Sequence, residues 1–292
     1  MNSVVLASGT EYFSDEQPIN PFMDKDAVID LGAARAEHEA IMAALQGVGV
    51  TVLRVAPPEN CQDGVFTANW ALVRGKKAVM ARLPNARKNE EAYARQVLEA
   101  RGLEAIVLPE NLKFSGQGDA LPCGDLLFCG SGYRSDEAAQ KIAADTLGFR
   151  RVQLQTKPQL GNDGQPVVNA YSGLPDSFYY DIDLAISILK FPTETEKGLI
   201  AWCPEAFLPE SVATMRALDE VDKIEISEEE AMQALCCNLV STGTHVVMNA
   251  GAPLFTDALR AHGLTPILLS NPELAKGGGS MRCTTLTLVE HI

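Results

Sequence analysis

The chain repeats one pattern of apolar and polar positions five times. Each copy has apolar residues at helical spacing, usually a glycine where this stretch ends, and then a short run rich in β-branched residues. This pattern predicts an amphipathic helix, a glycine cap and a strand. The predicted pairs of helix and strand are 33–46 with 50–55, 90–100 with 104–108, 136–147 with 151–154, 210–218 with 223–226, and 253–262 with 266–269.

A second predicted strand follows each pair after a polar loop. These strands are 70–73, 125–129, 183–189, 245–248 and 283–288, and residues 4–7 offer an incoming strand to the first helix. A doubly wound sheet would alternate strands and helices without such pauses. The pattern therefore favours one α/β domain over residues 1–292, in which five units close into a ring around a pseudo-fivefold axis and residues 4–7 pair near 283–288. An ordinary three-layer α/β fold is the alternative.

In such a ring, the polar loops after the helix–strand pairs would meet at one central site. The loops carry mostly carboxylates and amides, together with one cysteine, Cys283, that follows the glycine run 277–279. Carboxylates match the donors of a planar, guanidinium-like cation, and a thiolate beside that cation could attack carbon. No helix follows the glycine run, so it does not predict a phosphate site. We expect these glycines to let the backbone approach a ligand closely.

Composition narrows the classes of function. Asp and Glu number 38 against 24 Lys and Arg, and the resulting net charge of −14 argues against binding to nucleic acid or to an anionic membrane. No apolar run reaches the roughly 18 residues of a membrane span, and the first residues do not resemble a secretion signal. The seven cysteines lack CxxC spacing and the four histidines lack ligand spacing. We expect a cytoplasmic protein without a metal or other cofactor, either a monomer or a homodimer.

Five segments, in order, resemble motifs of one superfamily. Residues 11–13 and 19–23 resemble its "YF … INPWM" opening, and 65–69 resemble "VFTAN". Residues 114–121 resemble "FEGxGDxL", 132–135 resemble "GxRT", and 277–286 resemble the glycine-rich terminal strand with the catalytic cysteine. On these motifs the chain resembles the guanidino-group-modifying, or pentein, superfamily of amidinotransferases, arginine deiminases, arginine dihydrolases and dimethylarginine dimethylaminohydrolases. The resemblance implies a five-bladed αβ-propeller with ββαβ repeats.

The resemblance also implies roles for particular residues. Cys283 matches the nucleophile, and Asp183 matches the aspartate that holds the guanidinium in the motif "HLD". Two positions depart from the family: Ser115 stands where the family has Glu, and Asp181 stands where it has the His that protonates the leaving amine and activates water. The expected substrate-binding residues are Asn20, Asn69, Ser115, Asp119 and Asp183.

Two functions are consistent with these residues. As an enzyme, the protein would be a hydrolase or an amidinotransferase in which Cys283 attacks the guanidino or amidino carbon of a small cationic, arginine-like substrate. Asp181 would be the acid and base, with its pKa raised by burial or by Asp183, and the two carboxylates would share a proton or a cation. His245, which opens a predicted strand, is the other imidazole that could serve. Because losing an acid–base group costs about 10²–10⁴ in rate, the alternative is a catalytically reduced protein that binds a cation without turnover.

Overall fold

The strands of the protein form five separate three-stranded sheets. The computed structural model describes residues 3–289, and within them the middle strand of each sheet pairs antiparallel with one neighbour and parallel with the other. In spatial order, the sheets are β15 (Leu286–Val289), β1 (Val4–Ala7) and β2 (Thr51–Arg54); β3 (Ala71–Arg74), β4 (Lys77–Met80) and β5 (Glu104–Ile106); β6 (Ala120–Cys123), β7 (Leu126–Gly130) and β8 (Arg150–Leu154); β9 (Ile186–Lys190), β10 (Gly198–Trp202) and β11 (Val221–Glu225); and β12 (Val240–Ser241), β13 (His245–Asn249) and β14 (Thr265–Leu269).

A helix joins the two parallel strands of every sheet, as a parallel connection requires. These helices are α1 (Leu31–Gly47), α2 (Lys88–Glu99), α3 (Glu137–Leu147), α4 (Pro209–Ala217) and α6 (Pro253–Ala261). Two shorter helices, α5 (Glu228–Gln233) and α7 (Pro272–Lys276), lie outside this repeat. The Asp30 carboxylate caps α1 by accepting from the amides of Gly32 and Ala33, and Gly148 ends α3 in the left-handed conformation. The order strand, strand, helix, strand is therefore confirmed.

The predicted strands needed two kinds of correction. Four short strands were missing from the prediction, namely β4, β6, β10 and β12. Each pairs antiparallel with a predicted strand, and β12 has only two residues while β6 contains Pro122, so they carry little alternation of apolar and polar residues. In addition, β9 begins at Ile186 rather than at Asp183, and β15 begins at Leu286 rather than at Cys283. The residues of chemical interest lie in the turns that precede these strands.

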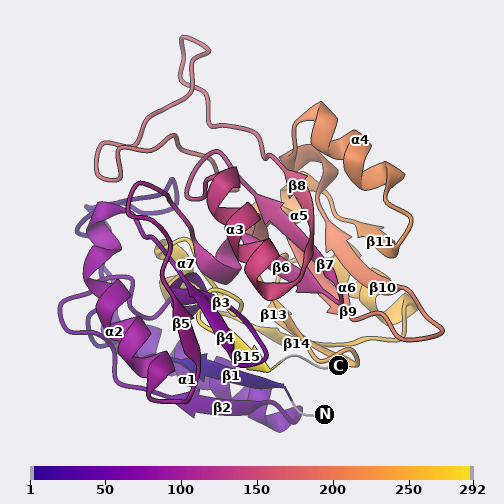
Figure 1. The fold of residues 1–292 in the computed structure, drawn as a ribbon, viewed down its shortest axis with the longest axis horizontal. Coiled ribbons are helices and arrows are strands. Elements are labelled where there is room, and N and C mark those ends of the chain that lie inside the picture. The colour runs from indigo at the N-terminus through magenta and orange to yellow at the C-terminus, as the bar shows by residue number, and fades with distance from the viewer. Residues whose placement is uncertain (1–2, 290–292) are drawn as a thin grey trace.

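In Figure 1, α2 and α4 lie at the periphery of the molecule, and β3 and β6 lie toward its middle. Contacts join β15 to β3, β6 to β9 and β9 to β12, so neighbouring sheets touch through these inner strands. The predicted pairing of residues 4–7 beside the cysteine-bearing segment is confirmed, since Val5 pairs with Thr287 and Leu6 with Leu286. The chain thereby brings its first and last described strands into one sheet.

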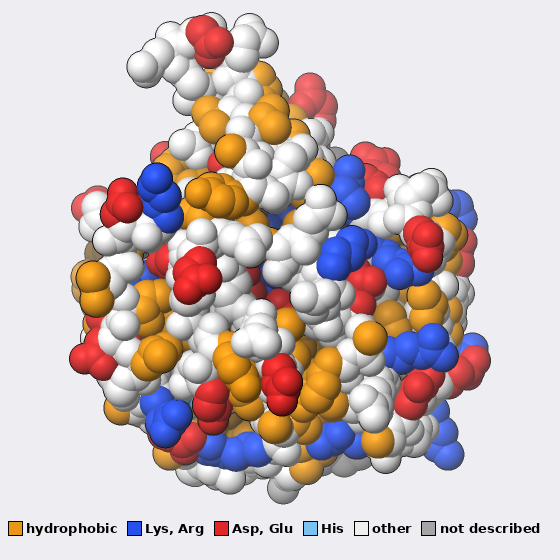
Figure 2. Space-filling model, turned by 90° about the vertical axis from the view of Figure 1, so that its left-hand side faces the viewer, with side chains coloured by type: hydrophobic (Ala, Val, Ile, Leu, Met, Phe, Trp, Pro, Cys, Tyr) orange, Lys and Arg blue, Asp and Glu red, His pale blue; other side chains and the backbone are white. Residues whose placement is uncertain are grey.

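Within the segment between β8 and β9, the part around residues 160–175 extends away from the rest of the molecule (Figures 1 and 2), whereas Thr156, Ser177 and Tyr180 are buried. Backbone bridges between Leu160 and Pro166 and between Val168 and Pro175 stiffen it. On the face drawn in Figure 2, Lys and Arg side chains are interspersed with Asp and Glu rather than gathered into a basic surface. Among residues 3–289, none of the helices combines the length and the apolar character needed to cross a bilayer.

Candidate active site

Cys283 lies in a turn between α7 and β15, and the Asn238 side chain, from outside that turn, contacts it at three points. The side-chain oxygen of Asn238, Oδ1, accepts from the backbone amides of Ser280 (2.9 Å) and Cys283 (3.2 Å). The side-chain nitrogen of Asn238, Nδ2, lies 3.1 Å from Cys283 Sγ. Asn238 lies two residues before the inner strand β12, so the fold brings it to the turn across 45 residues of sequence. The amide of Asn238 therefore fixes both the backbone of the turn and the direction of the thiol.

The glycines before Cys283 permit unusually close packing. A Cβ on Gly279 would lie 2.9 Å from the Cβ of Cys283, and a Cβ on Gly278 would lie 2.7 Å from both Asn20 Oδ1 and Tyr180 Oη. Gly278 also has a φ of +83°, which favours glycine. Asn20 donates to the carbonyl of Gly277 (3.0 Å) and Tyr180 to that of Gly278 (2.8 Å). Asn20 thus packs against the turn that carries Cys283.

Three buried carboxylates lie close to the thiol. Asp183 Oδ2 is 3.4 Å from Cys283 Sγ, and Asp119 Oδ1 accepts from the amide of Ile182 at 3.0 Å. Among the described residues, one oxygen of each of Asp119, Asp181 and Asp183 is buried without a hydrogen-bond partner. Buried carboxylate oxygens are normally paired, so the cluster has unused capacity for a donor-rich cation.

This crowding of negative charge changes the acidity of the cluster. Burial, and then the charge of Asp181, raises the pKa of Asp183 to about 8 and holds the pKa of Asp119 well above its ordinary value. Burial, followed by Asp183 and Asp181, also raises the pKa of the Cys283 thiol well above its usual range, and the Asn238 amide only partly opposes this. These surroundings therefore favour the neutral forms of both Cys283 and Asp183 near pH 7.

A second group of predicted residues is joined by the amide of Asn69. Its Nδ2 lies 2.8 Å from Asp181 Oδ2 and 2.9 Å from Ser115 Oγ, and its oxygen accepts from Arg87 at 2.7 Å. Gly118 makes this contact possible, because a Cβ there would lie 2.4 Å from Asn69 Nδ2 and 2.6 Å from Asp181 Oδ2. The two positions that depart from the family, Ser115 and Asp181, thus share one hydrogen-bond partner.

Two arginines complete the polar surroundings, and the sequence interpretation gave neither a role. Arg134 lies with its Cζ 4.0 Å from the centre of the Tyr180 ring, with Nη1 3.7 Å from Asp181 Oδ2. Arg87 forms a buried ion pair with Glu90 at 2.7 Å. Arg134 belongs to the "GxRT"-like segment, which was a usable signal. Arg87 had none beyond its i, i+3 spacing to an acidic residue in α2.

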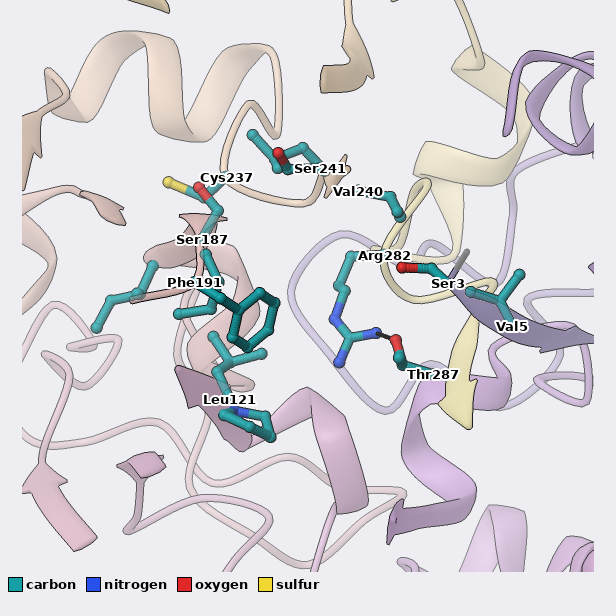
Figure 3. A pocket seen from close by; sticks show the side chains of 14 residues that line it. Ser3, Val5, Leu121, Ser187, Phe191, Cys237, Val240, Ser241, Arg282 and Thr287 are labelled. Carbon is teal, nitrogen blue, oxygen red and sulfur yellow. Dashed lines mark hydrogen bonds between the residues drawn. The ribbon is translucent and has the colours of Figure 1, made fainter. Parts of the chain in front are cut away.

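A cavity of about 70 Å³ lies next to this site and is lined in part by Arg282, the residue before Cys283. Figure 3 shows the side chains that line it. The Arg282 side chain points into it and donates to Thr287 Oγ1 at 3.2 Å and to Gln117 Oε1 at 3.0 Å. Cys283 and the three carboxylates are not among the residues that line this cavity. The positive charge of Arg282 nevertheless acts on Asp183 and lowers its pKa against the larger effect of burial. Two adjacent residues of this turn therefore face different groups: Arg282 lines the cavity, and Cys283 contacts Asp183.

The predicted site residues fall into two bonded groups and two residues attached to them. Cys283 contacts Asp183, while Asn69 joins Ser115 to Asp181. Asp119 contacts the backbone between the two aspartates, Asn20 contacts the glycine run, and all seven side chains are at most 3% exposed. Asp183 does not open a strand as predicted, because Ile182–Leu184 forms a 3-10 turn that directs it toward Cys283.

The alternative imidazole lies elsewhere in the structure. His245 starts β13, at the end of the β12–β13 hairpin remote from Asn238, and its Nδ1 lies 3.1 Å from Thr244 Oγ1. Over residues 3–289, no group of three or more His, Cys, Asp or Glu side chains has an arrangement that could hold a metal ion.

Comparisons with known proteins identify related sequences. A family model described as "N,N dimethylarginine dimethylhydrolase, eukaryotic" matches residues 11–167. The N(G),N(G)-dimethylarginine dimethylaminohydrolase of Mycobacterium tuberculosis is 30% identical over 279 residues, which cover 95% of this chain and 83% of that protein. The bifunctional arginine dihydrolase/ornithine cyclodeaminase AgrE of a Nostoc species is 29% identical over 243 residues, which cover 82% of this chain but only 31% of that longer protein.

The fold is also similar to that of solved structures of related enzymes. The N-terminal domain of the cyanobacterial arginine dihydrolase ArgZ, crystallised as a cysteine-to-serine mutant bound to substrate, superposes with a TM-score of 0.84 and 25% identity, covering 99% of both chains. Another structure of that domain is covalently bonded to a reaction intermediate. The resemblance inferred from the motifs is confirmed, and the matches over most of the sequence show that the chain belongs to the dimethylarginine dimethylaminohydrolase family.

Proposed function

We propose that the protein hydrolyses a carbon–nitrogen bond in the guanidino group of an arginine-like substrate, with Cys283 as the nucleophile. The observation that carries this proposal is the position of Cys283 Sγ, 3.4 Å from the Asp183 carboxylate and 3.1 Å from the Asn238 amide, beside buried carboxylate oxygens that lack partners. The related proteins support it, because they are named as hydrolases of dimethylarginine and of arginine, and one neighbouring structure contains a covalent intermediate.

Binding would be driven by the carboxylates. A guanidinium presents five N–H donors in one plane, and the partnerless oxygens of Asp119, Asp181 and Asp183 would receive some of them. Asn20, Asn69 and Ser115 would orient the substrate. Because its surroundings favour a protonated Asp183, a bound cation would expel that proton and leave a carboxylate. The same cation would lower the pKa of Cys283 and favour the thiolate.

The covalent chemistry then follows in two halves. The Cys283 thiolate adds to the guanidino carbon, and the resulting tetrahedral species expels ammonia or an amine, which takes up a proton as the carbon–nitrogen bond breaks. Water, losing a proton to the enzyme, adds to the carbon of the thioether-linked intermediate. The carbon–sulfur bond then breaks, which releases a ureido product and restores the thiolate.

The proton for the leaving amine would be the one that Cys283 gives up when its thiolate forms, taken up and passed on by the pair Asp181 and Asp183. Burial, and then the charge of Asp181, raises the pKa of Asp183 to about 8, so these surroundings can hold a carboxyl proton. Asp181 is the member of the pair bonded to Asn69, and Arg134 lies 3.7 Å away. We assign Asp181 the acid–base role that the family gives to histidine. His245 would not serve, because it lies at the far end of its hairpin.

Two further parts of the interpretation remain proposals. The five sheets would stand as blades around one pseudo-fivefold axis, and residues 1–292 would form a single domain, although residues 1–2 and 290–292 lie outside the described part. Contacts between inner strands and the pairing of β1 with β15 support this arrangement.

Amidino transfer to a second amine would share the first half-reaction, but the related proteins named above are hydrolases, and these names also disfavour a protein that only binds.

The proposal is tested by intact-mass measurement and by product assay with arginine, methylated arginine and 4-aminobutylguanidine (agmatine). We expect a ureido product from the wild type and an adduct that maps to Cys283. Cys283→Ser should lose both, whereas the matched control Cys61→Ser, at a buried cysteine in a different loop, should keep both. Ligand binding without adduct or product in the wild type would contradict the proposal and favour the binding protein.

A further inference from the structure

A crevice separate from the candidate active site lies where two strands of the first sheet end. The strands β1 and β2 run parallel, with Ala7 beside Arg54, and α1 connects them in the lower part of Figure 1. Ligands of α/β proteins commonly bind outside the carboxyl ends of parallel strands. The crevice has a volume of about 270 Å³ and is lined by residues 7–11, by Arg35, His38 and Glu39 of α1, and by Arg54 and Val55.

Two buried polar groups line this crevice without hydrogen-bond partners. Ser8 is 2% exposed and His38 is 4% exposed, and within residues 3–289 neither Ser8 Oγ nor His38 Nε2 has a hydrogen-bond partner. Buried polar atoms of this kind are normally bonded. Burial lowers the pKa of His38 to about 4, so its ring is neutral near pH 7. The two groups therefore offer hydrogen bonds, rather than charge, to a molecule in the crevice.

The charged side chains of the crevice are two arginines and two glutamates. Arg54 and Glu39 form an ion pair with each other. Arg35 and Glu11 line the same crevice, but in the described part of the chain neither of them has a hydrogen bond or an ion pair. The crevice thus presents one unpaired charge of each sign, and its charged side chains sum to zero.

The fold places these two charges on different elements, each next to one of the buried polar groups. Arg35 lies three residues before His38, so the two side chains share one face of α1. Glu11 follows Ser8 in the loop after β1, and a Cβ on Gly9 would lie 2.1 Å from Glu11 Oε2. The carboxylate of Glu11 therefore packs against the backbone of Gly9, which itself lines the crevice.

We infer that this crevice binds a small zwitterion, a free α-amino acid with an uncharged side chain, whose carboxylate faces Arg35 and whose ammonium group faces Glu11. A ligand with only one charge would leave one of these two side chains unpaired. Pockets for drug-sized ligands have volumes of about 300–1,000 Å³, so the smaller crevice suits a molecule of this size. The inference does not depend on the proposed function, because the candidate active-site residues do not line the crevice.

NMR titration of the wild-type protein with three small probes tests this inference. The probes are L-alanine, L-lactate, which lacks the ammonium group, and ethylamine, which lacks the carboxylate. We expect alanine to bind at least about tenfold more tightly than either analogue, because each analogue loses hydrogen bonds to a charged group. Glu11→Gln should reduce the affinity for alanine to that for lactate, and Arg35→Gln should reduce it to that for ethylamine. Both side chains are exposed, so both variants should fold.

Matched controls are Glu16→Gln and Arg95→Gln, which remove the same charges at exposed residues outside the crevice and should keep the preference for alanine. No binding of alanine, equal binding of the three probes, or a preference that persists in Glu11→Gln or in Arg35→Gln would overturn the inference. Displacement of alanine by 4-aminobutylguanidine would also overturn it, because the alanine would then occupy the candidate active site.

Discussion

Gly118→Ala is the sharpest perturbation of the proposed site, because it adds one carbon at a defined position. Gly118 has no positive φ, so its backbone accepts alanine without strain. The new Cβ would lie 2.4 Å from Asn69 Nδ2 and 2.6 Å from Asp181 Oδ2, whereas ordinary contacts are about 3.5 Å. Each group must therefore retreat by about 1 Å, and a misplacement of this size costs roughly a hundredfold in rate.

The assay compares kcat and KM for the best guanidino substrate with the midpoint of thermal unfolding. We expect kcat/KM of Gly118→Ala to fall about a hundredfold, mostly through kcat, while the protein remains folded at the assay temperature. Gly47→Ala is the matched control, since nothing lies within 4 Å of its new Cβ and alanine stabilises a helix by up to about 1 kcal/mol. A wild-type kcat/KM in Gly118→Ala would refute the view that the contact between Asn69 and Asp181 matters for catalysis.

Three further outcomes are expected. Asn238→Ala should raise the pKa of Cys283 further and slow turnover by about tenfold to a hundredfold, because the hydrogen bond to the Cys283 thiolate is lost. The pH dependence of Cys283 alkylation checks this, and an unchanged profile would contradict it. Asp181→Asn should abolish turnover while calorimetry still detects binding, and Asp181→His with Ser115→Glu should restore or increase hydrolysis; an active Asp181→Asn protein would exclude the assigned role. Because folding raises the pKa of Asp183 from 3.8 to about 8, its contribution to stability is full below about pH 4 and is lost as the pH rises through 8; urea unfolding across this range should show a decline that Asp183→Asn flattens.

Periodicity predicted the helices well because each of the five repeat helices buries one face. The predicted helix 136–147, for example, differs by one residue from Glu137–Leu147, which ends where Gly148 adopts a φ of +72°. Strands of two to five residues offer too few positions to show alternation, which explains the loss of β10 and β12. Their existence depends on pairing with a neighbour rather than on a local pattern.

The site was predictable as a set of loops but not as a set of contacts. Motifs pointed to Asn69 and Cys283, yet the bond between Asn238 and Cys283 depends on how two sheets meet, and no local pattern encodes that distance. Asp15 is a second example. Its polar neighbours suggest a solvated loop, and the fold instead buries its carboxyl group against another acidic residue.

The pairing of β1 with β15 has a consequence for biosynthesis. These strands are joined across almost the whole length of the sequence, and contacts of such long range form slowly because most of the chain must be ordered first. Cys283 is anchored immediately before β15, so a ribosome must deliver residues up to about 289 before the nucleophile turn can be held in place. The growing polypeptide would therefore acquire a reactive Cys283 only when β15 pairs with β1, and a fragment that ends before β15 would lack it.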